Sequence, residues 1–288
     1  MSKKKKIACL IASGVILAVL CLFTYMLGLA FKLTTVEYTI KAKVNQQICI
    51  VQLSDLHDAQ FGEDNKDLIS SVRNKHPDLI FMTGDMINKD TQDLSRLKNL
   101  ITESCKIAPV YYGFGNHERI WQKVHSPDLS QIIKECGATV LENKYVDLTI
   151  NGNSVRIGGY SGYYGTPHMV SNDAESQKSF WQFKKLFENT NRLKILLAHI
   201  PTPWIDWEYI NKYDVDIVFL GHYHGGEIKV PFAGGLYAPY IGYWPQNTEG
   251  VFYGSKGVCV LSTGLGSEHV LRFNNPPQIV VADLVSNE

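Results

Sequence analysis

The stretch Gly221-His222-Tyr223-His224-Gly225-Gly226 decides how the rest of this chain is interpreted. It directly follows residues 215–220, an apolar and β-prone run that predicts a buried strand. The flanking glycines favour a tight turn, in which two imidazoles at positions i and i+2 can point toward one place. Taken alone, the pattern favours two surface histidines in a glycine-rich turn. That interpretation changes because four other segments of the chain end in side chains of metal-ligand type.

The composition is typical of a globular protein with a packed core. The chain has 288 residues, of which 45% are hydrophobic and 19% charged. After the N-terminal segment, about 255 residues remain, a usual length for one large α/β or β-sandwich fold. The formal net charge is zero. Because proteins that bind polyanions normally carry a basic excess, we expect no nucleic-acid partner. The oligomeric state stays open.

The N-terminal segment has the pattern of a membrane anchor. Lys3-Lys4-Lys5-Lys6 precede residues 7–31, an almost uncharged apolar stretch longer than the ~20 residues that cross a bilayer as a helix. The lysine cluster outnumbers the scattered lysines of residues 32–43. We therefore expect a single-pass protein of the cell membrane with an extracytoplasmic domain. The alternative is a cleaved signal peptide, for which Gly28-Leu29-Ala30 supplies small residues.

These patterns divide the chain into three parts. Residues 1–31 form the basic N-terminus and transmembrane anchor. Residues 32–47 form a connector and a first strand, since residues 35–43 alternate in a strand-like way. Residues 48–288 form one large domain, because no internal repeat or low-complexity linker interrupts them.

The first half of this domain alternates strands with helices. Residues 48–53, 78–82 and 109–114 are short apolar runs that predict buried strands, each ending in a polar turn. Residues 64–75 and 93–103 have apolar side chains at helical spacing. Such alternation predicts parallel βαβ units with a functional site at the carboxyl ends of the strands.

The second half of the domain is richer in short strands. Asn151-Gly152 is a hairpin-turn signal. Residues 179–188 hold an aromatic stripe, and we expect this stripe to be a helix face packed on the core. The predicted strands are residues 138–141, 145–150, 155–158, 193–198, 215–220, 227–230, 258–261 and 278–284.

Five strand ends carry side chains with nitrogen or oxygen donor atoms. A histidine at the end of a buried strand is costly to place without a partner. Each motif alone is weak evidence, but five of them, all without a thiolate, are hard to explain as unrelated turns. The residues are Asp55 and His57; Asp85; Asn116 and His117; His199; and His222 and His224.

Together these residues resemble the calcineurin-like metallophosphoesterase family. Its pattern is D-x-H, then G-D, then G-N-H-[D/E], then a separate H, then G-H-x-H. The chain carries all of these in order: Asp55-Leu56-His57, Gly84-Asp85, Gly115-Asn116-His117-Glu118, His199 and Gly221-His222-Tyr223-His224. Residues 224–227, 236–239, 264–266 and 271–274 are similar to a narrower branch of membrane-tethered bacterial phosphoesterases that cleave a UDP-diacylglucosamine pyrophosphate.

The resemblance implies a fold and a metal centre. The fold is an α/β class, four-layer α/β/β/α sandwich, and residues 48–288 become a metallophosphoesterase domain. The centre takes two divalent metal ions, and the donor set leaves Mn, Fe, Zn and Ni open. Asp85 is the bridging carboxylate between the ions. The implied ligands are Asp55, His57, Asp85 and His224 for one ion, and Asp85, Asn116, His199 and His222 for the other.

The resemblance also suggests residues that act around the metals. His117 is the expected general acid for the leaving group. Glu118 either orients His117 or is a solvated residue at a helix N-terminus. Purple acid phosphatases have a tyrosine ligand where this chain has Asn88, so that subgroup is disfavoured. Weaker candidates for substrate contact are His168 and Tyr237.

Several alternatives remain open at this point. The expected reaction is hydrolysis of a phosphodiester or pyrophosphate bond in a phosphate ester, with a lipid-linked or UDP-diacylglucosamine-like substrate preferred because the chain is anchored. A soluble phosphomonoester or nucleotide is the alternative substrate, and a catalytically dead binding scaffold the alternative function. Residues 232–244 either line an apolar groove or pack in the core. A disulfide between Cys105 and Cys136 is neither predicted nor excluded by their spacing.

Overall fold

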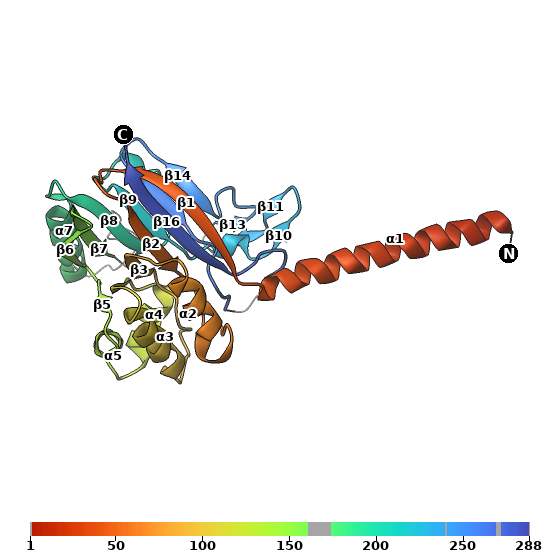
Figure 1. Cartoon of the computed structure of the whole chain (residues 1–288), viewed down its shortest axis with the longest axis horizontal. Coiled ribbons are helices and arrows are strands. Elements are labelled where there is room, and N and C mark those ends of the chain that lie inside the picture. Colours follow the sequence, from red (N-terminus) through yellow and green to blue (C-terminus); the bar gives the residue numbers. More distant parts are fainter. Residues whose placement is uncertain (1, 161–173, 240, 269–271, 288) are drawn as a thin grey trace.

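The computed structural model describes residues 2–160, 174–239, 241–268 and 272–287 (Figure 1). Its first sheet has the strand order β1-β16-β2-β3-β4-β5. Strands β2 to β5 run parallel, as predicted, and β16 is antiparallel to β2 and parallel to β1. The strands are β1 (Thr34–Ala42), β2 (Ile48–Leu53), β3 (Leu79–Met82), β4 (Val110–Tyr112), β5 (Thr139–Val140) and β16 (Gln278–Ser286).

The second sheet has the order β14-β15-β9-β8-β7-β6. Its four central strands are parallel, and both edge strands are antiparallel to their neighbours. The predicted Asn151-Gly152 turn joins β6 to β7. The strands are β6 (Lys144–Ile150), β7 (Asn153–Gly159), β8 (Leu193–His199), β9 (Ile217–Leu220), β14 (Gly250–Tyr253) and β15 (Val258–Leu261).

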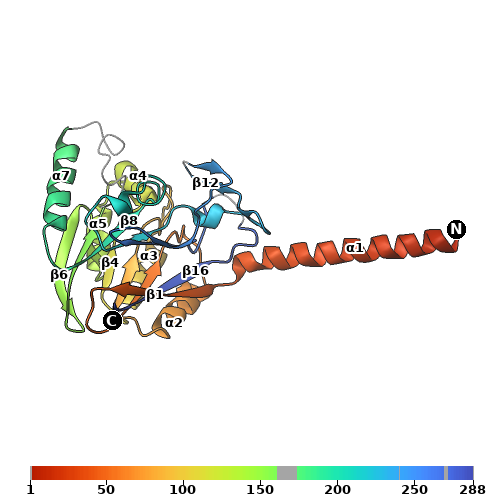
Figure 2. The same ribbon diagram turned by 90° about the horizontal axis from the view of Figure 1, so that it is seen from above.

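The two sheets pack face to face and helices cover their outer faces, so the predicted four-layer α/β/β/α sandwich is confirmed (Figures 1 and 2). Strand alternation explains the layers: Ile50 points into the core between the sheets, whereas Val51 points toward the outer helices. One outer layer consists of α2 (Lys66–Arg73), α3 (Ser95–Cys105), α4 (Asn116–Val124) and α5 (Leu129–Glu135), and α7 (Ala174–Glu188) forms the other.

The aromatic stripe of residues 179–188 is only partly a core face. Phe180, Phe183 and Phe187 have the spacing of one helix face and pack on the second sheet. Trp181 and Leu186 lie on the other side of α7 and are exposed. The prediction was therefore right for the phenylalanines and wrong for these two residues, because helical geometry separates them from that face.

Residues 227–244 do not complete the large sheets. They form two small two-stranded sheets, β10 (Lys229–Val230) with β11 (Gly234–Gly235), and β12 (Tyr237–Ala238) with β13 (Gly242–Tyr243). The strand predicted at residues 227–230 thus belongs to a separate hairpin. The aromatic side chains of Phe232, Tyr243 and Trp244 are exposed, so the alternative that they pack in the core is wrong.

Helix α1 (Lys3–Gly28) extends away from the folded domain in both views (Figures 1 and 2). Together with the 3₁₀ turn η1 (Leu29–Phe31), it is long and apolar enough to cross a membrane. At 1.5 Å per residue its 26 residues span about 39 Å, which exceeds a hydrocarbon core of ~30 Å. The six cysteines are free thiols, including Cys105 and Cys136.

Replacing Phe187 with alanine should lower the free energy of unfolding by about 3–5 kcal/mol, because the fully buried ring would leave a cavity. The matched control is Trp181→Ala on the same helix. Trp181 is 49% exposed, so its loss should change the free energy by only about 0.5 kcal/mol. Urea denaturation of the detergent-solubilised chain measures both values. Equal losses would contradict the assignment of the two helix faces.

Candidate metal centre

The seven predicted metal ligands meet at one edge of the sandwich. Asp55 and His57 follow β2, Asp85 follows β3, His199 ends β8, and the two histidines of the opening motif follow β9. Asn116 is the first residue of α4, which follows β4. The two sheets are joined here by Gln52, whose buried amide donates 2.9 Å hydrogen bonds to Leu220 O and to Thr83 Oγ1.

The backbone at this edge is unusual. Six of the seven residues have φ between 48° and 70°, the left-handed region that side chains other than glycine rarely adopt. Such conformations cost roughly 1–3 kcal/mol each and cluster at functional sites. They turn successive side chains toward the same point, which a regular strand cannot do. The six are Asp55, His57, Asp85, His199, His222 and His224.

Glycines in the motifs allow the carboxylates to approach the backbone. A Cβ atom at Gly221 would overlap the Ser54 hydroxyl and the Asp55 carboxylate. A Cβ atom at Gly115 would overlap the carboxylate of Asp85. These two glycines are therefore required by packing, because any larger residue would overlap the carboxylates.

Asp85 lies at the middle of the cluster. Its Oδ2 is 3.1 Å from His199 Nε2, 3.9 Å from His57 Nε2 and 4.0 Å from His222 Nδ1. Its Oδ1 accepts a 2.8 Å hydrogen bond from the backbone N–H of His117. One carboxylate oxygen therefore faces imidazoles from both sheets.

Asp55 forms the other half of the cluster. Its Oδ1 accepts a 2.9 Å hydrogen bond from the backbone of His222 and lies 3.8 Å from His224 Nε2. The rings of His57 and His224 are 5.0 Å apart. Two groups of three side chains could therefore each hold a metal ion: Asp55, His57 and His224, and Asp85, His199 and His222.

Three imidazoles are held in place by hydrogen bonds on their Nδ1 atoms. His57 Nδ1 is 2.9 Å from Asn88 Oδ1, His199 Nδ1 is 2.8 Å from Thr83 O, and His224 Nδ1 is 3.3 Å from Gly266 O. Each acceptor oxygen places a proton on Nδ1, so that Nε2 is the nitrogen that faces the cluster, as in metal-binding histidines.

Asn88 was noticed in the sequence only as a departure from the tyrosine of purple acid phosphatases. In the structure its side-chain Oδ1 accepts a hydrogen bond from His57 Nδ1. Its side-chain amide donates a 3.2 Å hydrogen bond to the His57 carbonyl. Its position three residues after Asp85 indicates that Asn88 lies near the metal centre, but no local sequence pattern indicates that it contacts the ring of His57.

Two buried polar atoms of the predicted ligands lack hydrogen bonds. Within the described part of the chain, His57 Nε2 and Asn116 Oδ1 have no hydrogen-bond partner. Buried polar atoms without partners are rare and costly, and bound cations would satisfy both. The residues present therefore fit a metal centre.

The protonation states of two histidines suit cation binding. Burial, followed by the neighbouring His224, lowers the pKa of His57 to about 4. Burial, followed by the Arg272 guanidinium, lowers the pKa of His224 to about 3. Both rings are thus neutral at pH 7, and only the neutral ring offers a lone pair to a metal ion.

Asp85 and His199 behave as an ion pair. Burial alone would raise the pKa of the Asp85 carboxyl, but His199 outweighs burial and holds this pKa well below its usual range. Burial alone would lower the pKa of His199, but Asp85 outweighs burial and raises this pKa to about 10. A proton on His199 therefore compensates the buried carboxylate, and a metal ion could take over that compensation.

His117 lies at the rim of the cluster with its ring edge-on to His57, 4.7 Å between centroids. Its Nδ1 accepts a 3.1 Å hydrogen bond from the backbone N–H of Lys89, which places the ring proton on Nε2. Glu268 Oε2 lies 3.4 Å from that Nε2, and Lys89 Nζ binds the other oxygen of Glu268 at 2.7 Å. Sequence reasoning missed Glu268, because it is about 150 residues away along the chain.

Glu118 does not orient the ring of His117, and it is not solvated. Its carboxylate is fully buried beneath the Asp85 turn. It accepts hydrogen bonds of 2.7–2.9 Å from the Tyr112 hydroxyl and from the backbone N–H groups of Asp85, Met86 and Gly115. Both sequence interpretations are corrected: Glu118 fixes the backbone that carries Asp85.

Of the two weaker substrate candidates, the structure describes only Tyr237, which is not one of the residues grouped at the cluster. Tyr237 lies in β12, is partly exposed, and packs against Tyr243 at 5.5 Å between ring centroids. Its strand adjoins the histidine motif through the hydrogen bond from Leu236 N to Gly226 O. His168 lies outside the described residues.

Comparisons with known proteins agree with this geometry. Residues 49–226 match the model of the calcineurin-like phosphoesterase family. The chain is 29% identical to the metallophosphoesterase YkuE of Bacillus subtilis, over 88% of this chain and 85% of that protein. It is 25% identical to the phosphodiesterase YaeI of Escherichia coli, over 82% of each chain.

The name of a third relative describes a substrate that carries acyl chains. The UDP-2,3-diacylglucosamine pyrophosphatase LpxG of Chlamydia muridarum is 23% identical, over 87% of this chain and 88% of that protein. The family match covers more than half of the chain and includes every residue of the cluster. The chain belongs to the calcineurin-like phosphoesterase family of hydrolases.

Proposed function

We propose that the protein is a binuclear-metal hydrolase of a phosphodiester or pyrophosphate bond. The observation that carries this proposal is the position of Asp85 Oδ2 between His57 on one side and His199 and His222 on the other. In this proposal Asp55, His57, Asp85 and His224 hold one ion, and Asp85, Asn116, His199 and His222 hold the other. The nitrogen and oxygen donors suit Mn, Fe, Zn or Ni.

The bound ions would polarise the phosphoryl oxygens and make water a nucleophile near neutral pH. The protein side chains have two further roles. His117 acts as the general acid in its doubly protonated form: Nε2–H, at the rim of the cluster, gives its proton to the leaving oxygen. A neutral ring remains, whose Nδ1 accepts the hydrogen bond from Lys89 N–H. Glu268 lies beside Nε2 and holds the ring while the proton moves. Glu118 keeps the Asp85 turn rigid through four hydrogen bonds.

We propose a lipid-linked phosphoester as the substrate. Helix α1 has the length and composition of a membrane anchor, and anchoring raises the local concentration of membrane lipids. The name of the relative LpxG describes cleavage of a diacylated nucleotide sugar, and the name of YaeI describes phosphodiester cleavage. Both names support a substrate with a phosphate linkage between two groups.

Asn88→Leu should weaken binding of the Mn²⁺ ion that His57 helps to hold by about 10–100-fold, because the His57 ring loses the hydrogen-bond acceptor that orients it. The other ion should bind as in the parent, because none of its ligands contacts Asn88. Calorimetric titration of the chelator-treated full-length chain measures both affinities. Asn99→Leu, which removes a surface amide of α3, is the matched control. Equal weakening at both ions would contradict the role given to Asn88.

His117→Ala should slow hydrolysis by about 10²–10⁴-fold when the leaving group is an alkoxide, which needs a proton. The loss should be much smaller with 4-nitrophenolate, a leaving group that departs without one. Steady-state rates for methyl and 4-nitrophenyl phosphodiesters with Mn²⁺ measure the two cases, and metal analysis verifies that the variant is loaded. The same loss for both esters would exclude His117 as the general acid. A loaded parent protein that cleaves neither ester would support a binding scaffold instead.

We also propose that the domain lies outside the cytoplasm. The basic cluster Lys3-Lys4-Lys5-Lys6 forms the first residues of α1 and precedes its apolar part, and such clusters stay on the cytoplasmic side. An alkaline phosphatase fused to the C-terminus, which folds only outside the cytoplasm, should therefore be active. Changing the four lysines to glutamine should reduce that activity by weakening the orientation signal. A fluorescent cytoplasmic reporter that is active at the same position would reverse the topology.

A further inference from the structure

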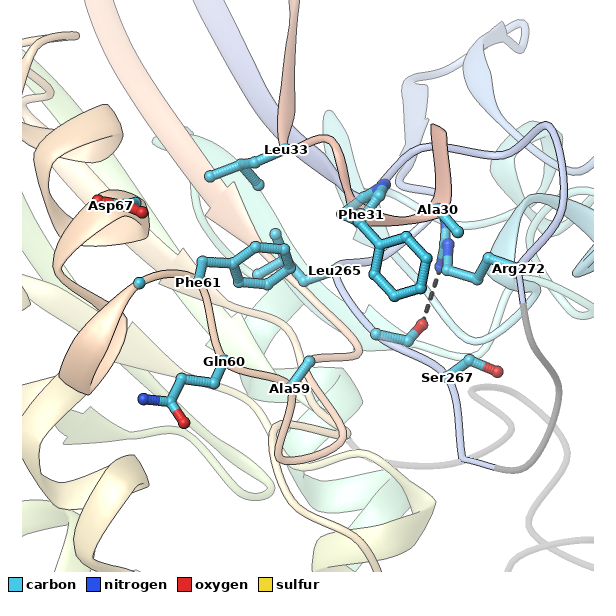
Figure 3. Close-up of a pocket in the computed structure, with 13 residues that line it drawn as sticks. Ala30, Phe31, Leu33, Ala59, Gln60, Phe61, Asp67, Leu265, Ser267 and Arg272 are labelled. Carbon is cyan, nitrogen blue, oxygen red and sulfur yellow. Dashed lines mark hydrogen bonds between the residues drawn. The ribbon is translucent and has the colours of Figure 1, made fainter. Parts of the chain in front are cut away.

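A cavity of about 600 Å³ lies between the end of the membrane helix and the metal centre (Figure 3). This volume is within the range of pockets that hold small ligands, ~300–1,000 Å³. Four of its wall residues are apolar and large: Phe31, Leu33, Phe61 and Leu265 (Figure 3). The complete lining is Ala30, Phe31, Leu33, Ala59, Gln60, Phe61, Gly62, Asp67, Leu265, Gly266, Ser267, Arg272 and Pro277.

One end of the cavity lies where the chain leaves the membrane. Ala30 and Phe31 are in η1, directly after α1. The last turns of α1 are tied to the domain by the hydrogen bond from Asn274 N to Met26 O, 3.0 Å, and by the ring contact of Phe23 with Phe273, 5.2 Å. If α1 spans the membrane, these contacts hold the cavity near the end of the hydrocarbon core.

Exposed aromatic side chains mark the same end of the domain. The β10–β13 hairpins lie beside the base of α1 in both views (Figures 1 and 2). They expose Phe232, Tyr243 and Trp244. Aromatic residues concentrate at membrane–water interfaces, so these side chains fit a domain whose cavity end rests on the lipid surface.

The other end of the cavity adjoins the metal centre through one strip of chain, residues 265–268. Gly266 lines the cavity, and its backbone N–H donates a 2.6 Å hydrogen bond to Asp55 O. The carbonyl oxygen of Gly266 accepts a hydrogen bond from His224 Nδ1. Ser267 also lines the cavity, and the next residue, Glu268, contacts His117. A ligand in the cavity therefore ends beside the cluster.

The one arginine of the lining does not act as an anion receptor. Arg272 is buried and donates hydrogen bonds to Gly266 O and to Asn275 O and Oδ1. Its guanidinium therefore holds the cavity wall together. The lining also includes the polar side chains of Gln60, Asp67 and Ser267. The four large apolar side chains of the wall offer a surface suited to hydrocarbon, and the phosphate belongs at the metal centre.

We propose that this cavity binds a fatty acyl chain of the substrate. The chain enters from the membrane leaflet past Phe31 and lies against Leu33, Phe61 and Leu265. The phosphoester linkage of the same molecule then lies at the metal centre. This inference rests on the proposed phosphoesterase function and names its substrate class, a phosphoester that carries a long acyl or alkyl chain.

The test uses the full-length chain in lipid nanodiscs with Mn²⁺ and a series of 4-nitrophenyl alkyl phosphodiesters, from methyl to dodecyl. The value of kcat/KM should rise with chain length by up to about fourfold per methylene buried, and should level off when the cavity is full. Ala30→Trp should fill the cavity and lower kcat/KM for the dodecyl ester at least tenfold. The methyl ester should be cleaved as by the parent. Ala30→Ser, which changes the residue without filling space, is the matched control.

Each outcome separates the two proposals. Cleavage of the methyl ester with no dependence on chain length would overturn the acyl-chain site and leave the hydrolase intact. An inactive protein would overturn the hydrolase, and the cavity is then tested by binding alone. A dodecyl phosphonate with a diazirine at the chain end should label residues 30–33 or 59–62 in the parent and not in Ala30→Trp. Labelling elsewhere would overturn the proposal.

Discussion

The burial of the Asp85 carboxylate between two sheets is the constraint on which the rest of this molecule depends. A charge with 1% of its surface exposed cannot remain ionised without compensation. The chain supplies that compensation through three imidazoles, a backbone N–H group and the proton on His199. A cation would satisfy the same carboxylate and also His57 Nε2, which has no hydrogen-bond partner among the described residues. The buried Asp85 carboxylate needs a nearby positive charge, and the same need underlies both the stability of this edge and its capacity to bind a metal ion.

That constraint explains why the centre lies at the edge of the sandwich and not within either sheet. Parallel strands end together, so β2 and β3 of one sheet and β8 and β9 of the other deliver their last residues to one place. Left-handed backbone at Asp55, Asp85 and His199 then turns the side chains inward. Buried hydrogen bonds of Glu118 and Gln52 to residues in and beside these turns stabilise them. The strain at the strand ends is compatible with folding because rigid, fully buried strands hold both sides of it.

The sequence predicted the strands well, and it identified the side chains that meet at the strand ends, because both carry local signals. Apolar runs define the strands, and each strand end has its own short motif. The contacts made by Asn88, Glu118 and Glu268 were missed or misassigned, because a hydrogen bond across the fold leaves no periodic trace in the sequence. The short helix α5 and the strand β14 escaped prediction for a related reason: each is stabilised by tertiary packing more than by its own residue pattern. Trp181 shows the same limit, since aromatic content alone does not tell which face of a helix is buried.

The proximity of the membrane helix to the metal centre argues for a substrate that is itself in the membrane. Asn274 holds the end of α1 through Met26 and also donates its side-chain amide to the Lys229 carbonyl in β10. The anchor, the aromatic hairpins and the wall of the cavity therefore share one short segment of chain, and the domain is not tethered by a flexible linker. A soluble substrate would gain nothing from this arrangement, because an enzyme on a long tether meets it equally well. A lipid phosphoester gains much, since its headgroup remains within a few ångströms of the interface, and only a site held at that height can reach it. If α1 is the anchor and the substrate is a lipid, as we propose, the geometry of the anchor is part of the specificity of the active centre.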